Sequence, residues 1–424
     1  MIRSVSALLA LPPPRAARGL RGLSLVPLLS ALACSDATGP GNGEPITELP
    51  RPLSAVEGEI LRASNTFAFD LAGELLPEAA DENLFFSPLS ASMLLGMILN
   101  GADGNTFDEM RHVLGFDGLS QEEINQGYAD LIDLLLNLDP AVTVEIGNSV
   151  WAQMAFPVLP DFTQRVQTSF GAASRNVDLG TPAALDAINE WASDATHGRI
   201  AKIFDELPAN AVMVLLNAIY FKADWTTQFD KARTEKAPFT RADGSQVMVD
   251  LMRLETEVAV ARRDGAVVVD LPYGGEAFSM SVVVPEVGAD VNDLVADLTA
   301  ESWDAWTEGL AEAKAVVYLP RFELEWEAEL NEMLQALGME DAFDPGAADF
   351  SRLTPGGGVW LALVKQKAFV KVDEEGTEAA AVTGGIMVDS APMEIRADRP
   401  FLFVLRERLT GAVLFMGVVN DPTG

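Results

Sequence analysis

Cysteine and histidine are nearly absent from this chain of 424 residues, which has one cysteine, Cys34, and two histidines, His112 and His197. The histidines lie in separate helical patterns, and neither accompanies a Gly-x-Ser-x-Gly or similar nucleophile motif. A single thiol cannot form an internal disulfide or a Cys/His zinc cluster. No spacing among the Asp and Glu residues marks a catalytic carboxylate pair. We therefore predict a protein that has no enzymatic site, metal or cofactor of its own.

Basic residues are also scarce, with 29 Lys and Arg against 63 Asp and Glu and a formal net charge of −34. A surface of such negative charge repels the phosphates of nucleic acid and the headgroups of anionic membranes. We therefore expect neither nucleic acid nor an anionic membrane surface among the partners of this protein.

Long apolar runs are missing beyond the N-terminus, where a short one follows a basic segment. Residues 23–33 are mostly apolar, are too short to span a bilayer and end directly before Cys34. Four arginines and no acidic residue precede them: Arg3, Arg15, Arg18 and Arg21. The segment resembles a bacterial lipoprotein signal, in which the cysteine becomes the lipid-carrying first residue. A plain secretory signal cut near Ala33 is the alternative.

The expected boundaries are a signal peptide over residues 1–33, a flexible tether over 34–55 and one large domain over 56–424. Without the leader, the chain has 25 basic residues and a formal charge of about −38. We expect an exported monomer in the extracellular space or the cell envelope. Its only membrane contact would be a lipid on Cys34.

What the sequence does contain is an unusual run near the C-terminus, residues 374–383. A strand-like alternation over 367–372 precedes it, and further strand candidates follow at 400–405 and 412–419. The joining segment is long and consists mainly of small residues punctuated by glycine, without the composition of a disordered tether. A long loop of this kind within a compact domain indicates a functional role.

This run also has the parity of a strand. Laid out as one, its uncharged face comprises Thr377, Ala379, Ala381, Thr383 and Gly385. From Thr377 to Gly385 the only charge is Glu378, and it falls on the other face with Ala380, Val382 and Gly384. The uncharged face could be buried in a sheet without burying an unpaired carboxylate. The composition is therefore compatible with an exposed loop that can become a central strand, and a flexible surface loop is the alternative.

The run and the segments around it resemble the serpin family. Residues 374–380 match the family's reactive-loop hinge, Glu-x-Gly-Thr-Glu-Ala-Ala. Residues 399–403 and 414–422 match its carboxy-terminal block, Arg-Pro-Phe-x-Phe followed by Leu-Phe-Met-Gly-x-Val-x-x-Pro. The resemblance covers about residues 57–422 and includes upstream matches at 83–90, 148–151, 188–191, 196–200, 216–225, 271–273 and 319–322.

The resemblance implies an α+β fold, in which a helix-rich amino-terminal part packs on a large central β-sheet, with further sheets and an exposed reactive loop. It also implies a suicide-substrate inhibitor of serine proteases: the protease cleaves the loop, is trapped as an acyl-enzyme, and the loop inserts as a central strand. Insertion of the serpin loop is an established example of strand addition and switching. The alternative is a non-inhibitory serpin that acts as a binding or chaperone-like module.

The hinge that the resemblance implies consists of Glu375, Gly376, Thr377, Glu378, Ala379, Ala380 and Ala381. Bulky or charged residues in the inserting face are typical of non-inhibitory members. Here that face carries small residues, and Gly376 supplies backbone freedom at the pivot. The hinge therefore favours inhibition.

The scissile bond has two candidate positions. Counting forward from Gly376 by the family's usual loop length places it at Ser390–Ala391, whereas counting back from Pro400 places it at Asp389–Ser390. We prefer Ser390–Ala391, because an acidic residue at the cleaved position is rarer, and Ser390 there predicts an elastase-like or subtilisin-like partner that accepts small side chains. Asp389 at the cleaved position would imply an acid-preferring protease.

Further residues match the family's supporting machinery. Ser87, Ser90 and Asn217 match its shutter, the hydrogen-bonded cluster under the sheet, and Trp225 matches the tryptophan where insertion starts. Gln366 stands where the family commonly has the shutter histidine, so pH dependence from that histidine is not expected; glutamine can still donate and accept hydrogen bonds. Ordinary core packing is the alternative role for these residues. The helix expected over 121–137 has no Lys or Arg, which argues against a heparin-type cofactor.

Overall fold

The computed structural model describes residues 45–79, 82–208, 210–377 and 392–424, all within one compact unit. The predicted signal peptide, Cys34 and residues 378–391 of the predicted reactive loop lie outside the described residues. In the described part, no helix has the length and apolar character needed to cross a membrane. The same part contains no group of three His, Cys, Asp or Glu side chains that could hold a metal ion.

The first half of the chain is mainly helical. Its elements are α1 (Ala55–Ala79), β1 (Leu84–Phe86), α2 (Pro88–Leu99), α3 (Gly104–Val113), α4 (Gln121–Asn137), β2 (Val142–Gln153), α5 (Pro160–Phe170), β3 (Ala173–Val177), α6 (Pro182–Ala195) and β4 (Met213–Asp224). Local sequence sets two of the helix starts. Ser87 caps α2 directly ahead of Pro88, and Ser120 forms a capping box with Glu123 at the start of α4.

The second half is mainly strand. Its elements are η1 (Lys231–Arg233), β5 (Glu235–Thr240), β6 (Gln246–Arg263), β7 (Ala266–Tyr273), β8 (Phe278–Pro285), α7 (Val291–Ala296), α8 (Ala300–Glu308), β9 (Ala311–Pro320), β10 (Phe322–Glu329), α9 (Asn331–Ala336), η2 (Asp341–Phe343), β11 (Lys365–Val372), β12 (Gly376–Thr377), β13 (Met393–Arg396), β14 (Phe401–Glu407) and β15 (Val413–Val419). Every residue of β14 and β15 is buried, as expected for strands that are covered on both faces.

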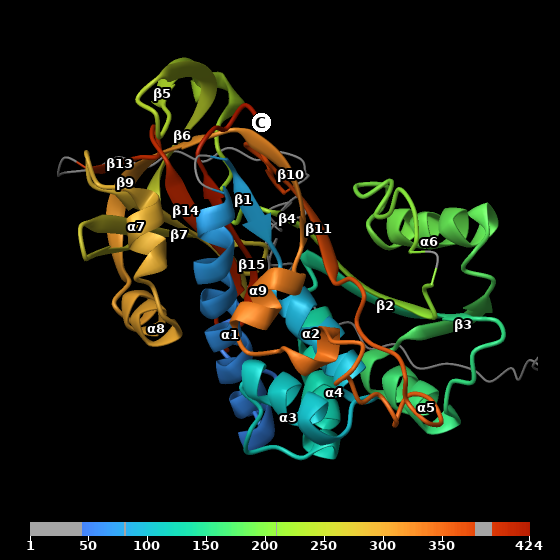
Figure 1. Cartoon of the computed structure of the whole chain (residues 1–424). Helices are drawn as coiled ribbons and strands as arrows, with labels where there is room; N and C mark the ends of the chain where they lie inside the picture. The colour runs from blue at the N-terminus through green and yellow to red at the C-terminus, as the bar shows by residue number, and fades with distance from the viewer. Residues whose placement is uncertain (1–44, 80–81, 209, 378–391) are drawn as a thin grey trace, which may run out of the picture. The chain divides into compact units, whose positions relative to one another are not determined.

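The described strands form three sheets (Figure 1). A nine-stranded sheet follows the order β1-β15-β14-β8-β7-β6-β9-β13, with β5 paired to β6. A four-stranded sheet has the order β12-β4-β2-β3, and β10 pairs with β11 in a sheet of two strands. Strands β2 and β4 are antiparallel, from Val142 opposite Ala223 to Ala152 opposite Met213.

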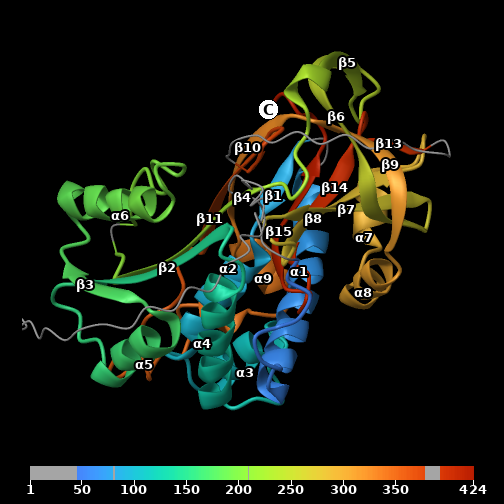
Figure 2. The same cartoon turned by 180° about the vertical axis from the view of Figure 1, so that it is seen from behind.

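Helices cover both faces of the four-stranded sheet. Figures 1 and 2 show α6 and α5 on opposite sides of β2. On the α6 side, Ile188 packs in one buried cluster with Trp151 of β2 and Leu216 of β4. On the other side lies α2, which contacts β4 and β15 and is buried at every position. Because α2 is enclosed between two sheets, it is a rigid support for whatever its ends hold.

Part of the predicted tether belongs to the folded domain. Ile46, Leu49 and Leu53 fall within residues 34–55 but pack against the core. The Ile46 N–H donates to the Gly275 carbonyl oxygen at 2.8 Å. Residues 46–55 therefore belong to the packed domain rather than to a free tether, because these apolar side chains gain more from burial than from solvent exposure.

The helical assignment of His197 is wrong. Helix α6 ends at Ala195, and His197 has a φ of 51°, followed by Gly198 at 78°. The Thr196 hydroxyl donates to the Ala192 carbonyl oxygen at 2.8 Å, so the last turn of the helix is closed by a side chain. The left-handed pair that follows cannot continue a right-handed helix.

Candidate functional site

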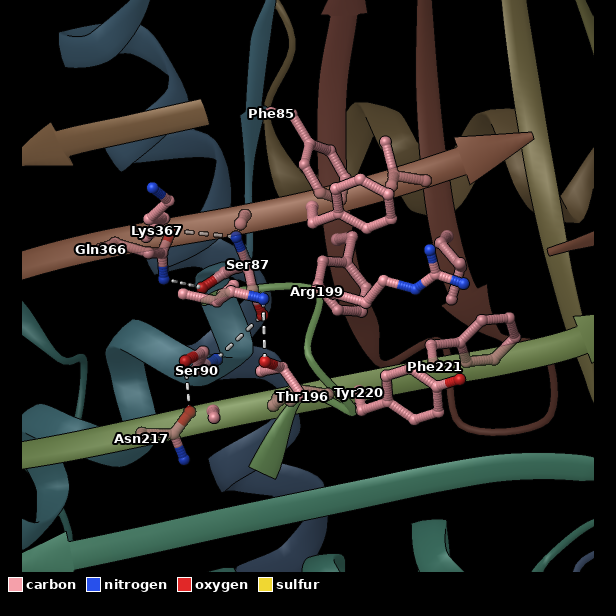
Figure 3. Close-up of a pocket in the computed structure, with 18 of the residues that line it drawn as sticks. Phe85, Ser87, Ser90, Thr196, Arg199, Asn217, Tyr220, Phe221, Gln366 and Lys367 are labelled. Carbon is pink, nitrogen blue, oxygen red and sulfur yellow. Dashed lines mark hydrogen bonds between the residues drawn. The ribbon is translucent and has the colours of Figure 1, made fainter. Parts of the chain in front are cut away.

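A cleft separates β4 from β11 (Figure 3). Both strands are described along their whole length, and no ladder of hydrogen bonds joins them. Residues 217–221 of β4 and 366–371 of β11 line a cavity of about 50 Å³ between them. This volume admits water but not a peptide strand. A further strand could enter only after β4 and β11 move apart.

The short strand β12 occupies one end of this opening. Gly376 pairs with Asp224 of β4, and Thr377 pairs with Ala223, in antiparallel register. Strand β12 also contacts β11. The first two residues of the predicted inserting run therefore already lie in the position of a strand next to β4.

Glycine is required at the start of β12. The backbone of Gly376 has a φ of 143°, which side chains of L-residues disfavour. A Cβ atom on Gly376 would lie 2.7 Å from the Asp224 Cα atom and 2.8 Å from the Trp225 nitrogen. Any larger residue would push the chain away from β4, so the close approach depends on this glycine.

A buried carboxylate anchors the chain just before the hinge. Glu374 is 1% exposed, and Arg321 donates to both of its oxygens, from Nε to Oε2 at 2.7 Å and from Nη2 to Oε1 at 2.5 Å. The Thr234 hydroxyl also donates to Oε1. Burial raises the pKa of Glu374, but the hydrogen bonds from Arg321 and Thr234 outweigh it and hold the pKa below its usual value.

Sequence reasoning missed this anchor. Glu374 was part of the hinge motif but was not singled out, and its partner Arg321 lies 53 residues earlier in the chain. The available signal was the match at residues 319–322, which contains that arginine. The neighbouring Glu375 forms an ion pair with Lys231, and this pair is more exposed to solvent than the pair between Glu374 and Arg321.

Aromatic packing closes the end of the cleft next to β12. Trp225 is 2% exposed and stacks on Tyr273, with ring centroids 4.2 Å apart and planes at 13°. Its indole N–H donates to the Asp373 carbonyl oxygen at 2.9 Å, and its backbone N–H donates to the Glu375 carbonyl oxygen at 2.9 Å. Trp225 therefore fixes the turn between β11 and β12 against β4.

The four residues matched to the shutter meet at the amino end of α2 (Figure 3). Gln366 of β11 accepts from the Ser87 N–H at 3.0 Å and donates to the Ser87 carbonyl oxygen at 2.8 Å. On the other side, the Ser90 hydroxyl donates to Asn217 of β4. Asn217 continues the network by donating to Asn148 at 2.7 Å. One buried helix end thus holds both strands that flank the cleft.

The segment after α6 crosses the same cleft. Thr196, Arg199 and Ile200 line the cavity, and the Arg199 guanidinium lies 5.2 Å from the centre of the Phe369 ring of β11. His197 contacts the Tyr220 ring of β4 and lies 3.0 Å, Nε2 to Oε2, from a glutamate of β2. His197 is thus part of a contact between this segment and the sheet.

Several predicted site residues have no described position. These are Cys34, Glu378, Ala379, Ala380, Ala381, Asp389, Ser390 and Ala391. The other histidine, His112, lies in α3 as expected, is exposed, and contacts Asp117 at 2.7 Å.

Comparison with known proteins identifies the family. The family model described as Serpin (serine protease inhibitor) matches residues 62–422. The chain belongs to the serpin family. Iripin-2 of Ixodes ricinus is 36% identical to this serpin over 375 residues, covering 86% of this chain and 94% of that protein. Leukocyte elastase inhibitor of Xenopus tropicalis is 33% identical, covering 85% of this chain and 98% of its own length.

Solved structures give the same assignment. Human thyroxine-binding globulin superposes with a TM-score of 0.81 at 28% identity, covering 87% of this chain and 100% of its own. The predicted serpin fold, with helices packed on a large β-sheet, is confirmed. The description of the family and the name of the Xenopus tropicalis relative both refer to inhibition of proteases. The bacterial type and the lipoprotein-like signal of this serpin stay predictions.

The Glu374 anchor leads to a test of stability. We expect Glu374→Gln to lower the free energy of unfolding at pH 7 by about 1–3 kcal/mol, because the charged acceptor of the Arg321 and Thr234 hydrogen bonds is lost. Glu375→Gln is the matched control, since its pair with exposed Lys231 contributes about 0–1 kcal/mol. If urea unfolding shows the same loss of unfolding free energy for both variants, Glu374 does not anchor the chain as described.

The same variants have an expected pH dependence. Because the folded state lowers the pKa of Glu374, its stabilisation is complete above the unfolded pKa of about 4.3 and is lost as the pH falls through the folded pKa. The difference in unfolding free energy between wild type and Glu374→Gln should therefore narrow below about pH 4. Urea unfolding of both proteins at about pH 7 and pH 3.5 measures this difference in unfolding free energy. A difference that is larger at the lower pH would contradict a lowered pKa of Glu374 in the folded state.

Proposed function

We propose that this serpin inhibits serine proteases as a suicide substrate. The observation that carries the proposal is β12, which pairs with β4 beside a cleft that has no strand ladder across it. Cleavage of the loop would release its amino-side segment, which then continues β12 as a strand between β4 and β11.

The chemical step belongs to the protease. Its serine hydroxyl attacks the carbonyl carbon of Ser390, the peptide bond to Ala391 breaks, and an ester to Ser390 forms. The proton taken from the serine by the protease histidine leaves on the new amine of Ala391. The inhibitor contributes only the bond and the subsequent movement. That movement must outpace hydrolysis of the ester, since water would otherwise release the protease.

Two registers support insertion along the whole cleft. Strand β12 runs antiparallel to β4, so each later loop residue would meet the residue one place earlier in β4, and Thr383 would fall opposite Asn217. On the other flank, the Asp373 N–H donates to the Gly376 carbonyl oxygen at 3.1 Å, which sets the turn after β11. Continued from that pair, Thr383 would fall opposite Gln366. The two counts are independent and agree on one residue between the two shutter strands.

The expected position of Thr383, between Asn217 and Gln366, gives a way for the shutter to open. Moving β4 and β11 apart strains the hydrogen bonds by which α2 holds Asn217 and Gln366. A hydroxyl at Thr383 arrives between these two amides and can both donate and accept. The two residues that precede Thr383 in the same face, Ala379 and Ala381, would meet Phe221 and Ile219 of β4 and must be small to fit.

Insertion also supplies the reach that trapping needs. From Gly376 to Ser390, a strand extends on the order of 50 Å at about 3.3 Å per residue. Each new backbone hydrogen bond to a flanking strand contributes about 1 kcal/mol net, and the strand has two neighbours. A protease held at Ser390 would therefore be carried along the length of the sheet while the ladder forms.

The target follows from the residue at the cleaved bond. Ser390 has a small side chain, which suits elastase-like or subtilisin-like proteases. The similarity to a protein named leukocyte elastase inhibitor supports the same class. A heparin-type cofactor is not part of the proposal, because α4 carries no Lys or Arg.

The first test is covalent trapping. Incubation with elastase and with subtilisin should give a complex that survives SDS, and mass spectrometry of the released fragment should show a new N-terminus at Ala391. A new N-terminus at Ser390 would show instead that the cleaved bond is Asp389–Ser390. Cleavage by several proteases without any complex would favour the non-inhibitory alternative, a binding or chaperone-like module.

A second test concerns the hinge. Thr377→Arg would put a charged residue at the position that pairs with Ala223, and burying that charge on insertion costs several kcal/mol and should slow insertion more than about tenfold. The loop should still be cleaved, but the protease should be released and the cleaved protein should gain no thermal stability. Thr377→Ser is the matched control and should behave as wild type. A trapped complex with Thr377→Arg would overturn the insertion step.

We also propose that the protein is exported and held at the cell envelope by a lipid on Cys34. The sequence supports it through the apolar segment that ends directly before this cysteine. Cys34→Ser should move the protein from the membrane fraction to the soluble fraction, while Ser35→Ala, the matched control, should not. Wild-type protein in the soluble fraction would favour the plain secretory signal.

A further inference from the structure

A second cavity lies where β6 and β7 separate. Strand β7 pairs with residues 259–263 of β6, and β5 pairs with residues 246–251. Strand β9 occupies the other side of β6 at both Leu251 and Ala259, so β5 and β7 share one side. On that side, no described strand pairs with residues 252–258 of β6. A cavity of about 240 Å³ lies there, many times the space of about 10–15 Å³ that one water needs.

A buried carboxylate lines this cavity, that of Asp270 in β7, which is 1% exposed. Its Oδ1 accepts hydrogen bonds from Ser279, Ser281 and Arg406. Its Oδ2 lies 3.1 Å from Nε of Arg408, in an ion pair that is not a hydrogen bond, and no donor among the described residues bonds to it. Buried polar oxygens rarely lack a hydrogen bond, so Oδ2 is an acceptor for a donor from outside the chain.

The charges around Asp270 are balanced. Burial raises the pKa of Asp270, but the Arg406 guanidinium and the Ser281 hydroxyl outweigh burial and hold this pKa below its usual value, so the carboxylate is ionised. Arg406 and Arg408 both pair with Asp270, and Arg408 also lies 3.6 Å from Glu276. This end of the cavity thus has two acids and two bases. A neutral donor such as a hydroxyl therefore suits Oδ2 better than a further cation.

The other end of the cavity is acidic. Glu257 of β6 and Glu312 of β9 line it and are exposed, whereas Lys314, the cross-strand neighbour of Glu257, does not line it. Glu312 lies opposite Ala259, and Ala259 lies opposite Asp270, so these three residues form a row across three strands. Side chains directly opposite each other share one face, and two strand spacings make the row about 10 Å long. Only the methyl group of Ala259 stands between the two acids of the row.

Apolar side chains complete the cavity. The buried residues Trp225, Phe229, Leu254 and Leu271 line it. The rings of Trp225 and Phe229 meet edge to face, with centroids 6.0 Å apart. These walls suit a flat apolar or aromatic group rather than a fully polar molecule.

We infer that this cavity binds a small amine with an apolar body and a hydroxyl at the end opposite its ammonium group. The ammonium group would lie against Glu257 and Glu312, where the charge is negative. The hydroxyl would donate to Oδ2 of Asp270, and the short side chain of Ala259 leaves room for the apolar body between them. This site goes beyond the proposed inhibition and does not depend on loop insertion, so either can fail without the other.

Isothermal titration calorimetry with three related compounds tests the site. The first, para-(aminomethyl)benzyl alcohol, carries both polar groups and should bind one to one. The second, para-methylbenzylamine, lacks the hydroxyl and should bind about tenfold more weakly, because Oδ2 of Asp270 is left without a donor. The third, para-(hydroxymethyl)benzoate, has a carboxylate in place of the ammonium group and should not bind measurably, because Glu257 and Glu312 repel it. Equal affinities for the first two compounds, or no binding of the first, would overturn the inference.

Charge variants separate this site from a general attraction of amines to an acidic protein. Glu312→Gln should weaken binding of the amino alcohol about threefold, the size typical of one exposed ion pair. Glu323→Gln in β10 is the matched control, because Glu323 is also exposed but does not line the cavity, and it should leave the affinity unchanged. If both variants weaken binding equally, the amine is held by the overall charge and the site does not exist.

A variant that fills the cavity tests its location. Ala259→Leu places a larger side chain between Asp270 and Glu312 and should abolish binding of the amino alcohol. Unchanged affinity in folded Ala259→Leu would contradict a site at this row. If that variant does not fold, the comparison of Glu312→Gln with Glu323→Gln decides, since both of these residues are exposed.

Discussion

The hydrogen bonds at the amino end of α2 hold together the two strands that flank the cleft, and the behaviour of the sheet depends on them. Gln366 of β11 is bonded twice to the backbone of Ser87, and Asn217 of β4 accepts from Ser90 one turn later. Helix α2 is buried at every position, so it cannot follow either strand outward. Parting the strands must therefore disturb this cluster, and a polar side chain brought in from the loop can restore what is lost.

The hinge combines two opposite requirements. Gly376 lies so close to β4 that a side chain at this position would collide with the backbone of β4. Because glycine has no side chain, the chain can pair with β4 here. Two residues earlier, the buried carboxylate of Glu374 is held by Arg321 and Thr234, which keeps the chain from slipping. Together they fix the register in which β12 begins. Every later contact of an inserted loop, including the one with Asn217, follows from that starting register.

Much of the fold could be predicted from the sequence, because local periodicity and family motifs are carried by neighbouring residues. Helix α4 and strands β11, β14 and β15 lie within two residues of their expected bounds. The Glu374 anchor could not be found this way, because its arginine is 53 residues away and only folding brings the two together. His197 was misplaced for a related reason: the Thr196 hydroxyl and the left-handed turn that follows end α6 where the residue pattern still allowed a helix.

The sequence by itself determined that residues 377–385 have one uncharged face, as a strand that could be buried requires. The parity of Thr377, Ala379 and Ala381 and the single outward charge at Glu378 are properties of residue order, and they hold in any structure with a strand at this place. Only the tertiary structure decided where the loop would go. Register depends on which backbone atoms pair, and the pairing of β12 with β4 and the turn after β11 are contacts between distant parts of the chain.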